Sequence, residues 1–163
     1  MTIEIRRAEE RDRQDLLKVW HQGWHDAHAN LVPPHILKYR TPEHFSIWLS
    51  QTPDTFYVAG NTSSLLGFVS TKDAELVKLY VASEARGTDV AKALLAYAEQ
   101  TLRNAGFMAA HLFCTAGNLR AQRFYLREGW RLLETFEDSL WVPSDVAMQY
   151  PVETHRYQKS LRN

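Results

Sequence analysis

The fold of this chain is decided by residues 75–106, which read ELVKLYVASEARGTDVAKALLAYAEQTLRNAG. The first part, Glu75 to Val81, predicts a strand, because its residues can be assigned alternately to two faces with a period of two. One face of this strand is expected to carry Glu75, Val77, Leu79 and Val81, and the other Leu76, Lys78 and Tyr80. After a polar turn centred on Gly87, the apolar residues take the spacing of an amphipathic helix that begins near Asp89 and is closed by Gly106.

This turn predicts an anion site. A strand that enters a helix through small residues directs unpaired backbone N–H groups outward, together with the positive end of the helix dipole. Phosphate is the anion that such an arrangement binds most naturally. We therefore expect the turn that begins at Arg86 to bind a phosphate-bearing ligand.

Two segments resemble the signatures of the GNAT superfamily of N-acetyltransferases. The acetyl-CoA signature of that family reads Arg or Gln, two residues, Gly, one residue, Gly or Ala. The corresponding positions here are Arg86, Gly87, Thr88, Asp89, Val90 and Ala91. The first and last positions fit, whereas Asp89 stands where the family has glycine. The second segment, NLRAQRFYLREGW at residues 118–130, is similar to Asn-x-x-Ala-x-x-Phe-Tyr-x-x-x-Gly-Phe, with Trp130 in place of Phe. The two signatures together identify the chain as a member of the superfamily.

The other periodic segments predict the remaining elements. Strands are expected at residues 2–8, 56–60, 65–71, 108–115, 130–136 and about 147–159, with residues 61–64 as a hairpin turn. Helices are expected from residues 9–12 to about 29, at 34–39, from Thr41 onward, and between Asn118 and Gly129. The order β-α-α-β-β-β-α-β-α-β-β is that of a GNAT fold over a single domain, residues 1–163. The resemblance implies a mixed α/β (α+β) architecture, in which a mostly antiparallel twisted sheet of about seven strands has helices on both faces and a splay between strands 4 and 5.

The amino-acid composition limits the kinds of binding partner that can be expected. Lys plus Arg and Asp plus Glu number 19 each, so the formal net charge is zero and no broad electrostatic attraction to nucleic acid or an anionic membrane is expected. The values of 45% hydrophobic and 23% charged residues are ordinary for a globular domain. Cys114 is the single cysteine, which excludes an intramolecular disulfide. No apolar run of signal-peptide or membrane-spanning length is present, so the cytoplasm is the expected location.

The resemblance also implies ligands and site residues. The cosubstrate would be acetyl-CoA, and the acceptor an amine that attacks the thioester directly, without an acyl-enzyme. Backbone groups of Leu79, Tyr80 and Val81 would bind the pantetheine chain and polarise the thioester carbonyl. The turn from Arg86 to Ala91 would bind the pyrophosphate. In the second signature Asn118, Ala121 and Tyr125 would lie against the cofactor, with Asn118 also capping its helix.

Two residues are candidates for proton transfer. Tyr125 stands where the family's tyrosine can protonate the leaving thiolate, although a tyrosine in a Phe-Tyr pair can also belong only to the core. Glu75 stands where some relatives carry a glutamate that takes the amine proton through water, and partial burial against Val77 and Leu79 would raise its pKa. Glu75 can equally be the exposed start of a strand. The base would then be His111, His25 or His28.

Other side chains have a structural interpretation that competes with a functional one. The histidines at 21, 25 and 28 lie on one stripe of a helix without a matching carboxylate or thiolate, so we predict a polar stripe facing the substrate cleft and no metal site. Cys114 is expected to be a buried strand thiol rather than a nucleophile. Trp48 and Tyr39 are expected in the core, with a position beside the acceptor pocket as the alternative.

Two classes of function follow from these residues. The first is an N-acetyltransferase, a monomer or homodimer, that acts on a primary amine of a small molecule or peptide. The second is a degenerate GNAT domain that binds coenzyme A weakly or not at all and serves as a sensor or interaction module. The second class is suggested by Asp89, which is expected to cap its helix and to compete with the phosphates for the same N–H groups. A pair between Arg86 and Asp89 would soften that competition.

Overall fold

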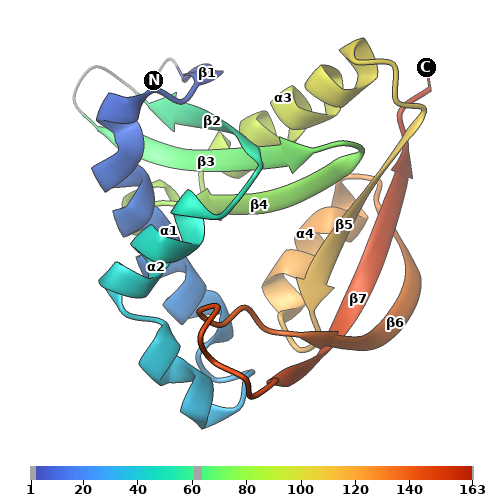
Figure 1. Ribbon diagram of the computed structural model, residues 1–163. Coiled ribbons are helices and arrows are strands. Elements are labelled where there is room, and N and C mark those ends of the chain that lie inside the picture. The colour runs from blue at the N-terminus through green and yellow to red at the C-terminus, as the bar shows by residue number, and fades with distance from the viewer. Residues whose placement is uncertain (1–2, 61–63, 163) are drawn as a thin grey trace.

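The computed structural model describes residues 3–60 and 64–162, in which a mixed sheet carries helices on both of its faces (Figure 1). The strands are β1 (Glu4–Arg7), β2 (Thr55–Gly60), β3 (Leu65–Lys72), β4 (Glu75–Val81), β5 (Ala109–Thr115), β6 (Arg131–Ser139) and β7 (Pro151–Ser160). The helices are α1 (Arg13–His28), α2 (Pro42–Ser50), α3 (Val90–Asn104) and α4 (Leu119–Arg127). Short 3-10 helices are η1 (Glu10–Asp12), η2 (Pro34–Tyr39) and η3 (Ser83–Ala85). The predicted order of strands and main helices is confirmed.

Within the described residues the strands form one seven-stranded sheet in the order β1-β2-β3-β4-β5-β7-β6. Neighbouring strands are antiparallel except β4 and β5, which are parallel and pair only at Glu75 and His111. Beyond that pair the two strands diverge, as the directions of β4 and β5 in Figure 1 show. The predicted splay between strands 4 and 5 is confirmed.

Helices cover both faces of the sheet because both faces carry apolar side chains. On one face α1, η2 and α2 bury a cluster that includes Leu16, Trp20, Trp24, Ile36, Phe45 and Phe68. On the other face α3 and α4 bury a cluster that includes Val90, Leu94, Leu95, Ala98, Leu112 and Tyr125. The parallel pair β4 and β5 is joined by α3, the crossover that parallel neighbours require.

A β-bulge overturns the predicted alternation of β4. The register with β3 shifts so that Thr71 pairs with Leu76 but Ser70 pairs with Lys78, which leaves an extra residue in β4. Leu76 therefore packs in the same cluster as Leu79 on the α3 face, and not on the face of Lys78. Because directly paired residues share a face, the bulge also places Glu75 on the α1 side of the sheet, with Lys78.

Local sequence signals fix most element ends. The hydroxyl of Thr41 accepts a hydrogen bond from the backbone N–H of His44, and the side chain of Asn118 accepts one from Ala121, as expected of caps. Gly106 and Gly129 adopt left-handed φ values of 97° and 93°, which end α3 and α4 as predicted.

Several predicted bounds were wrong for physical reasons. The first helix begins at Arg13, because residues 10–12 form η1, in which the Asp12 carboxylate accepts a hydrogen bond from the backbone N–H of Glu9. The last strand begins at Pro151 rather than near Ala147, because a turn closed by Val146 N–H and the Pro143 carbonyl occupies the preceding loop. Strand β5 starts one residue after Met108, and β6 continues to Ser139. The predicted β2–β3 hairpin is antiparallel, but residues 61–63 of its turn lie outside the described residues.

Among residues 3–60 and 64–162, no helix is long and apolar enough to cross a membrane.

Candidate active site

A cleft of about 1020 Å³ opens where β4 and β5 separate. Residues 77–81 of β4 and 113–115 of β5 form its walls, α4 and the turn before α3 border one end, and α1 borders the other. The predicted cofactor-binding residues that line the cleft are Leu79, Tyr80, Val81, Arg86, Gly87, Thr88, Asp89, Ala91, Asn118, Ala121 and Tyr125. Val90 does not line it, because its side chain is fully buried in the core beneath α3. The fold therefore brings both sequence signatures to one cavity.

The turn before α3 has the conformation of an anion site. Gly87 adopts a φ of 76°, a left-handed value that favours glycine and turns the chain into the helix. The hydroxyl of Thr88 donates to the carbonyl of Ala85 and accepts from the N–H of Val90 at 3.4 Å. The other backbone N–H groups of the first turn of α3 have no acceptor within the helix, as at helix starts in general.

Asp89 does not cap the helix, contrary to the prediction. Its side chain makes no capping hydrogen bond, and its backbone (φ −82°, ψ 6°) lies outside the extended region that capping residues adopt. Thr88 takes the capping role one residue earlier. The Asp89 side chain is exposed, so its carboxylate does not compete for the N–H groups in this conformation.

Arg86 does not pair with Asp89 either. Its Nη2 donates to Oδ2 of Asp26 on α1 at 2.6 Å. This hydrogen bond is the main reason why the pKa of Asp26 lies below its usual value. The ion pair joins the turn that begins α3 to the helix on the opposite face of the sheet.

Further cations surround the turn. Lys92 of α3 and the arginines of α4 at positions 120, 123 and 127 all line the cleft. These side chains were not among the predicted site residues, although Arg120, Arg123 and Arg127 lie inside the second signature. A cationic border next to free helical N–H groups suits the several negative charges of a nucleotide pyrophosphate.

Tyr125 is positioned by the core. It is 9% exposed, its ring lies 6.3 Å from those of Trp130 and Tyr157, and it lines the cleft. Burial raises its pKa, so the hydroxyl stays protonated and can donate a hydrogen bond at any working pH. Burial also raises the pKa of the neighbouring Cys114 to about 11, which keeps that thiol neutral and argues against a nucleophilic role.

Glu75 lies at the closed end of the splay. Its Oε1 is 3.8 Å from Nε2 of His111, the residue with which it pairs across β4 and β5. Burial, with a smaller contribution from Asp54, raises the pKa of Glu75. Burial lowers the pKa of His111. Neither side chain lines the cleft, so Glu75 would reach a substrate amine only through water.

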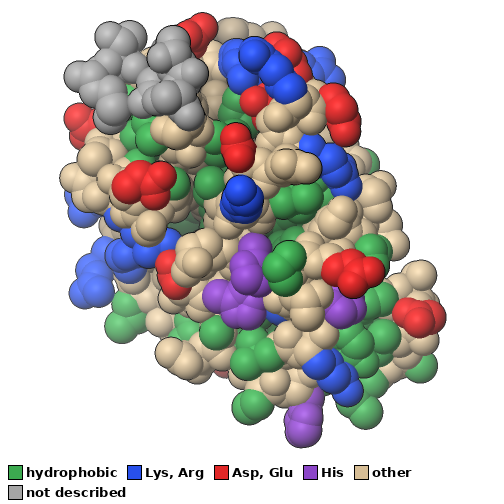
Figure 2. Space-filling model, turned by 90° about the vertical axis from the view of Figure 1, so that its left-hand side faces the viewer, with side chains coloured by type: hydrophobic (Ala, Val, Ile, Leu, Met, Phe, Trp, Pro, Cys, Tyr) green, Lys and Arg blue, Asp and Glu red, His purple; other side chains and the backbone are tan. Residues whose placement is uncertain are grey.

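The other histidines differ in their surroundings. Histidine side chains gather on the face formed by α1 and the segment that follows it (Figure 2). His25 donates from Nε2 to the carbonyl of Arg40 at 2.8 Å, whereas His28 lines the cleft and burial lowers its pKa to about 4. Within the described part of the chain, no three His, Cys, Asp or Glu side chains form a metal site.

Aromatic side chains line the end of the cleft beside α1. Trp20, Trp24 and Trp48 lie there, and Trp141 joins them from the loop at residues 140–150. The rings of Trp48 and Trp141 stack at 4.9 Å with an angle of 4°. Tyr39 does not line the cleft. Trp141 could not be found from a local pattern, because its partner Trp48 lies far away along the chain.

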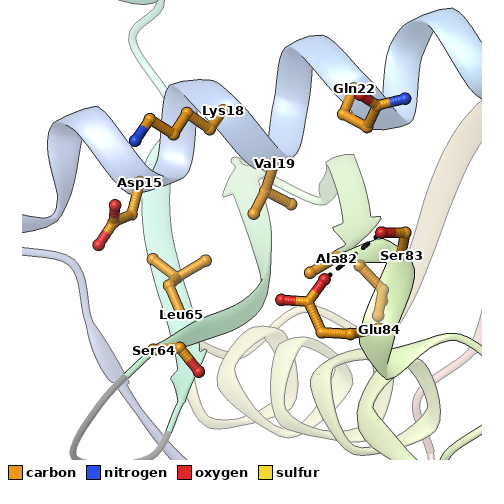
Figure 3. Close-up of a pocket in the computed structure, with 10 residues that line it drawn as sticks. Asp15, Lys18, Val19, Gln22, Ser64, Leu65, Ala82, Ser83 and Glu84 are labelled. Atoms are coloured by element: carbon orange, nitrogen blue, oxygen red, sulfur yellow. Dashed lines mark hydrogen bonds between the residues drawn. The ribbon is translucent and has the colours of Figure 1, made fainter.

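A second, smaller hollow of about 290 Å³ lies between α1 and the ends of β3 and β4 (Figure 3). Its lining mixes charges of both signs, Asp15, Lys18 and Glu84, with the apolar Val19 and Leu65. Val81 is the one predicted site residue among those that border it. Because Val81 also lines the cleft, the two cavities adjoin at the end of β4.

Comparisons with known proteins agree with this architecture. The model of the acetyltransferase (GNAT) family matches residues 13–130. A spermidine N(1)-acetyltransferase of Thermoplasma acidophilum is 27% identical over 148 residues, which cover 83% of this chain and 92% of that protein. The crystal structure of an N-acetyltransferase from Staphylococcus aureus Mu50 superposes with a TM-score of 0.73 at 17% identity, over 99% of this chain and 100% of that one. The PaiA N-acetyltransferase of Thermoplasma acidophilum, solved in complex with coenzyme A, gives a TM-score of 0.68 at 21% identity, over 98% and 99% of the two chains.

Proposed function

This chain belongs to the GNAT acetyltransferase family, and on that premise we propose that it transfers the acetyl group of acetyl-CoA to a primary amine of a small molecule or peptide. The observation that carries the proposal is the cleft between β4 and β5, which is lined both by the turn before α3 and by Tyr125 of the second signature. The amine would attack the thioester directly, because Cys114 is a neutral buried thiol and unsuited to carry an acyl group.

The residues present fit acetyl-CoA. The turn at residues 86–91, with the free N–H groups of α3, would hold the pyrophosphate, and Lys92 with the arginines of α4 would neutralise its charge. Backbone groups of Leu79 and Val81 in the splayed part of β4 would bind the pantetheine amides, since β5 does not pair with them. Asn118 and Ala121 would border the same chain from α4. The cosubstrate supplies the activated acetyl group, and these residues hold it in place.

Tyr125 would serve as the acid. Tyr125 lines the cleft, and none of the hydrogen bonds among residues 3–60 and 64–162 uses its hydroxyl, so a departing thiolate would be able to accept a hydrogen bond from it. The raised pKa of Tyr125 favours a strong hydrogen bond that stabilises the thiolate over complete loss of the proton.

Glu75 and His28 compete for the role of base. Glu75 has the better proton affinity, because its pKa is raised by burial toward the working range. His28 has the better position, because it lines the cleft, but a pKa of about 4 makes it a weak base at neutral pH. We propose Glu75, acting through water.

The alternative of a degenerate domain rests on Asp89. Its exposed carboxylate, without a bond to the helix N-terminus, leaves the pyrophosphate site open and favours the enzyme. Calorimetric titration with acetyl-CoA distinguishes the two, and ligand at a hundred times its dissociation constant should stabilise the fold by about 2.7 kcal/mol.

The acceptor is tested with a panel of amines. Free coenzyme A released in the presence of each amine would be measured against a reaction without amine. Polyamines belong in the panel because a relative acetylates spermidine by name. Absence of acetyl-CoA binding would favour the sensor or interaction module.

A further inference from the structure

A buried arginine with unpaired hydrogen-bond donors lies beside the cleft. Arg40, which follows η2, is only 1% exposed. Its Nη1 donates to the carbonyl of Tyr39 at 3.1 Å, but its Nε and Nη2 have no acceptor in the part of the chain that the structure describes. None of the ion pairs within that part includes Arg40. A guanidinium with unsatisfied donors in the interior requires a partner.

The guanidinium lies behind the aromatic end of the cleft. Its Cζ is 4.9 Å from the ring of Trp24, 4.8 Å from that of Trp48 and 5.8 Å from that of Trp141. All three rings line the cleft. His28, which also lines the cleft and contacts Trp24, contributes another buried atom without a partner, Nδ1. Three of the four buried side-chain atoms that lack a partner among the described residues therefore belong to Arg40 and His28, next to the acceptor side of the cleft, and the fourth is Nε of Arg156 on β7.

The aromatic rings satisfy the charge of Arg40 but not its hydrogen bonds. Ring faces attract a cation, yet they offer no oxygen or nitrogen acceptor to the N–H groups in the plane of the guanidinium. Burial accordingly lowers the pKa of Arg40 to about 10. The ligand group that matches an in-plane pair of guanidinium N–H donors is a carboxylate, which can accept both.

At the aromatic end of the cleft, Arg40 is a buried cation without a counter-ion among the described residues. The other buried cation, Lys78, is already paired with Asp54 at 2.7 Å. A substrate with several cationic groups would place one of them near Arg40 in a water-poor site, where like charges repel strongly. A carboxylate in the same position would be attracted and would receive hydrogen bonds.

Given acetyl transfer in this cleft, we propose that Arg40 binds a carboxylate of the acceptor, so that the acceptor is an amine that also carries a carboxylate, as amino acids do, and not a polyamine. Arg40 is then a specificity-determining residue. Trp141 is the ring that shifts to admit the carboxylate, because it stands on a loop and is the farthest of the three from the guanidinium. His25 fixes the backbone of Arg40 through its hydrogen bond to the carbonyl.

The test compares acceptors in matched pairs. Lysine with 1,5-diaminopentane, ornithine with 1,4-diaminobutane, and phenylalanine with phenethylamine differ only by the carboxylate. Release of free coenzyme A would give kcat/KM for each compound with the wild-type enzyme and with Arg40→Gln and Arg40→Lys. Arg13→Gln is the control, because Arg13 also contacts a backbone carbonyl, that of Ser46, but among the described residues it does not stack on the tryptophans of the cleft as Arg40 does. Thermal melting and calorimetric titration with acetyl-CoA would show that each variant is folded and binds the cosubstrate.

The expected result is that the wild-type enzyme prefers the carboxylate-bearing member of its best pair. Arg40→Gln should lower kcat/KM for that compound by about 10- to 100-fold, mainly through KM, and change the decarboxylated amine little. Arg40→Lys should restore part of the loss. Equal losses for both members of a pair, or a wild-type preference for the decarboxylated amines, would overturn the proposal while acetyl transfer stands. If Arg40→Gln is unfolded, the wild-type preference alone decides. Acetylation of none of the panel despite acetyl-CoA binding would count against the acceptor class proposed here, whereas failure to bind acetyl-CoA would count against the enzymatic function itself.

Discussion

The Asp26 carboxylate of α1 accepts a hydrogen bond of 2.6 Å from Arg86, the first residue of the turn proposed to bind the pyrophosphate. The pair crosses from the face of the sheet that carries α1 to the end of the cleft expected to hold the pyrophosphate. It therefore places a negative charge beside the site of a second, larger negative charge.

Asp26→Asn should tighten acetyl-CoA binding. The partners are 27% and 36% exposed, so the pair itself contributes about 0–1 kcal/mol and the fold should tolerate its loss. Removal of the carboxylate frees Arg86 for the phosphates. Calorimetric titration at low salt should show a severalfold lower Kd. In an Arg86→Gln background the same substitution should have a smaller effect, and an equal effect would mean that Arg86 is not the intermediary.

Asp89→Gly and Asp89→Asn should also lower the Kd for acetyl-CoA at low salt, because each removes a negative charge beside the turn. High salt should reduce the difference through screening. Since Asp89 makes no capping bond, Asp89→Asn should change the unfolding free energy by less than about 0.5 kcal/mol. Glu84→Gln, an exposed carboxylate of η3 outside the cleft, is the control. A Kd unchanged by both Asp89 variants would mean that this side chain lies away from the pyrophosphate.

Tyr125→Phe should lower kcat by about 10²–10⁴-fold if protonation of the thiolate limits the rate. The substitution removes a hydroxyl that has no partner among the described residues, so the fold and the Kd for acetyl-CoA should be preserved. Tyr157→Phe, at a buried tyrosine beside it that does not line the cleft, is the matched control. Steady-state kinetics and calorimetry would measure both, and a wild-type kcat in Tyr125→Phe would remove Tyr125 from the mechanism.

Glu75→Gln should reduce the rate most at low pH within the range where the wild-type carboxylate is ionised. The amine is hardest to deprotonate there, and the two pH–rate profiles should converge as the pH approaches the pKa of the amine. If the profiles overlay throughout, the base lies elsewhere, and His28→Asn and His111→Asn are the next variants to assay.

Glu75→Gln should also change how the stability of the fold depends on pH. Burial raises the pKa of Glu75, so the folded state binds the proton more tightly than the unfolded state. Stability must then fall as the pH rises from the unfolded pKa through the folded one. Glu75→Gln should therefore raise the melting temperature at neutral pH and have less effect under acid. A lower melting temperature at neutral pH would contradict this account of Glu75.

Asp12 should govern part of the acid stability. Its carboxylate accepts hydrogen bonds from Arg6 at 2.7 and 2.9 Å, which lower its pKa from 3.8 to about 2. Since one pKa unit corresponds to about 1.4 kcal/mol, the ionised Asp12 contributes about 2 kcal/mol above pH 4, and this is lost as the pH falls toward 2. Urea unfolding of Asp12→Asn should show a deficit near neutral pH that closes in acid. Asp15→Asn, in the first turn of α1, is the control.

The sequence by itself determined the order of the elements and the two signature segments that border the cleft. Periodicity located β4 and α3, the glycines at 106 and 129 fixed the helix ends, and Thr41 and Asn118 acted as caps. These signals were sufficient because each depends on interactions between residues a few positions apart. The turn before α3, with its left-handed Gly87, could be located for the same reason.

Tertiary structure alone decided which side chains meet. The bulge in β4 moved Glu75 to the opposite face, since register depends on the partner strand and not on the alternation of one segment. Arg86 found Asp26 instead of its neighbour Asp89, because the backbone at Asp89 turns its side chain into solvent while the fold brings α1 beside the turn. Arg40 became a buried cation among tryptophans from three separate segments. Contacts between distant segments follow from how helices pack on a twisted, splayed sheet, and no local pattern in the chain encodes them.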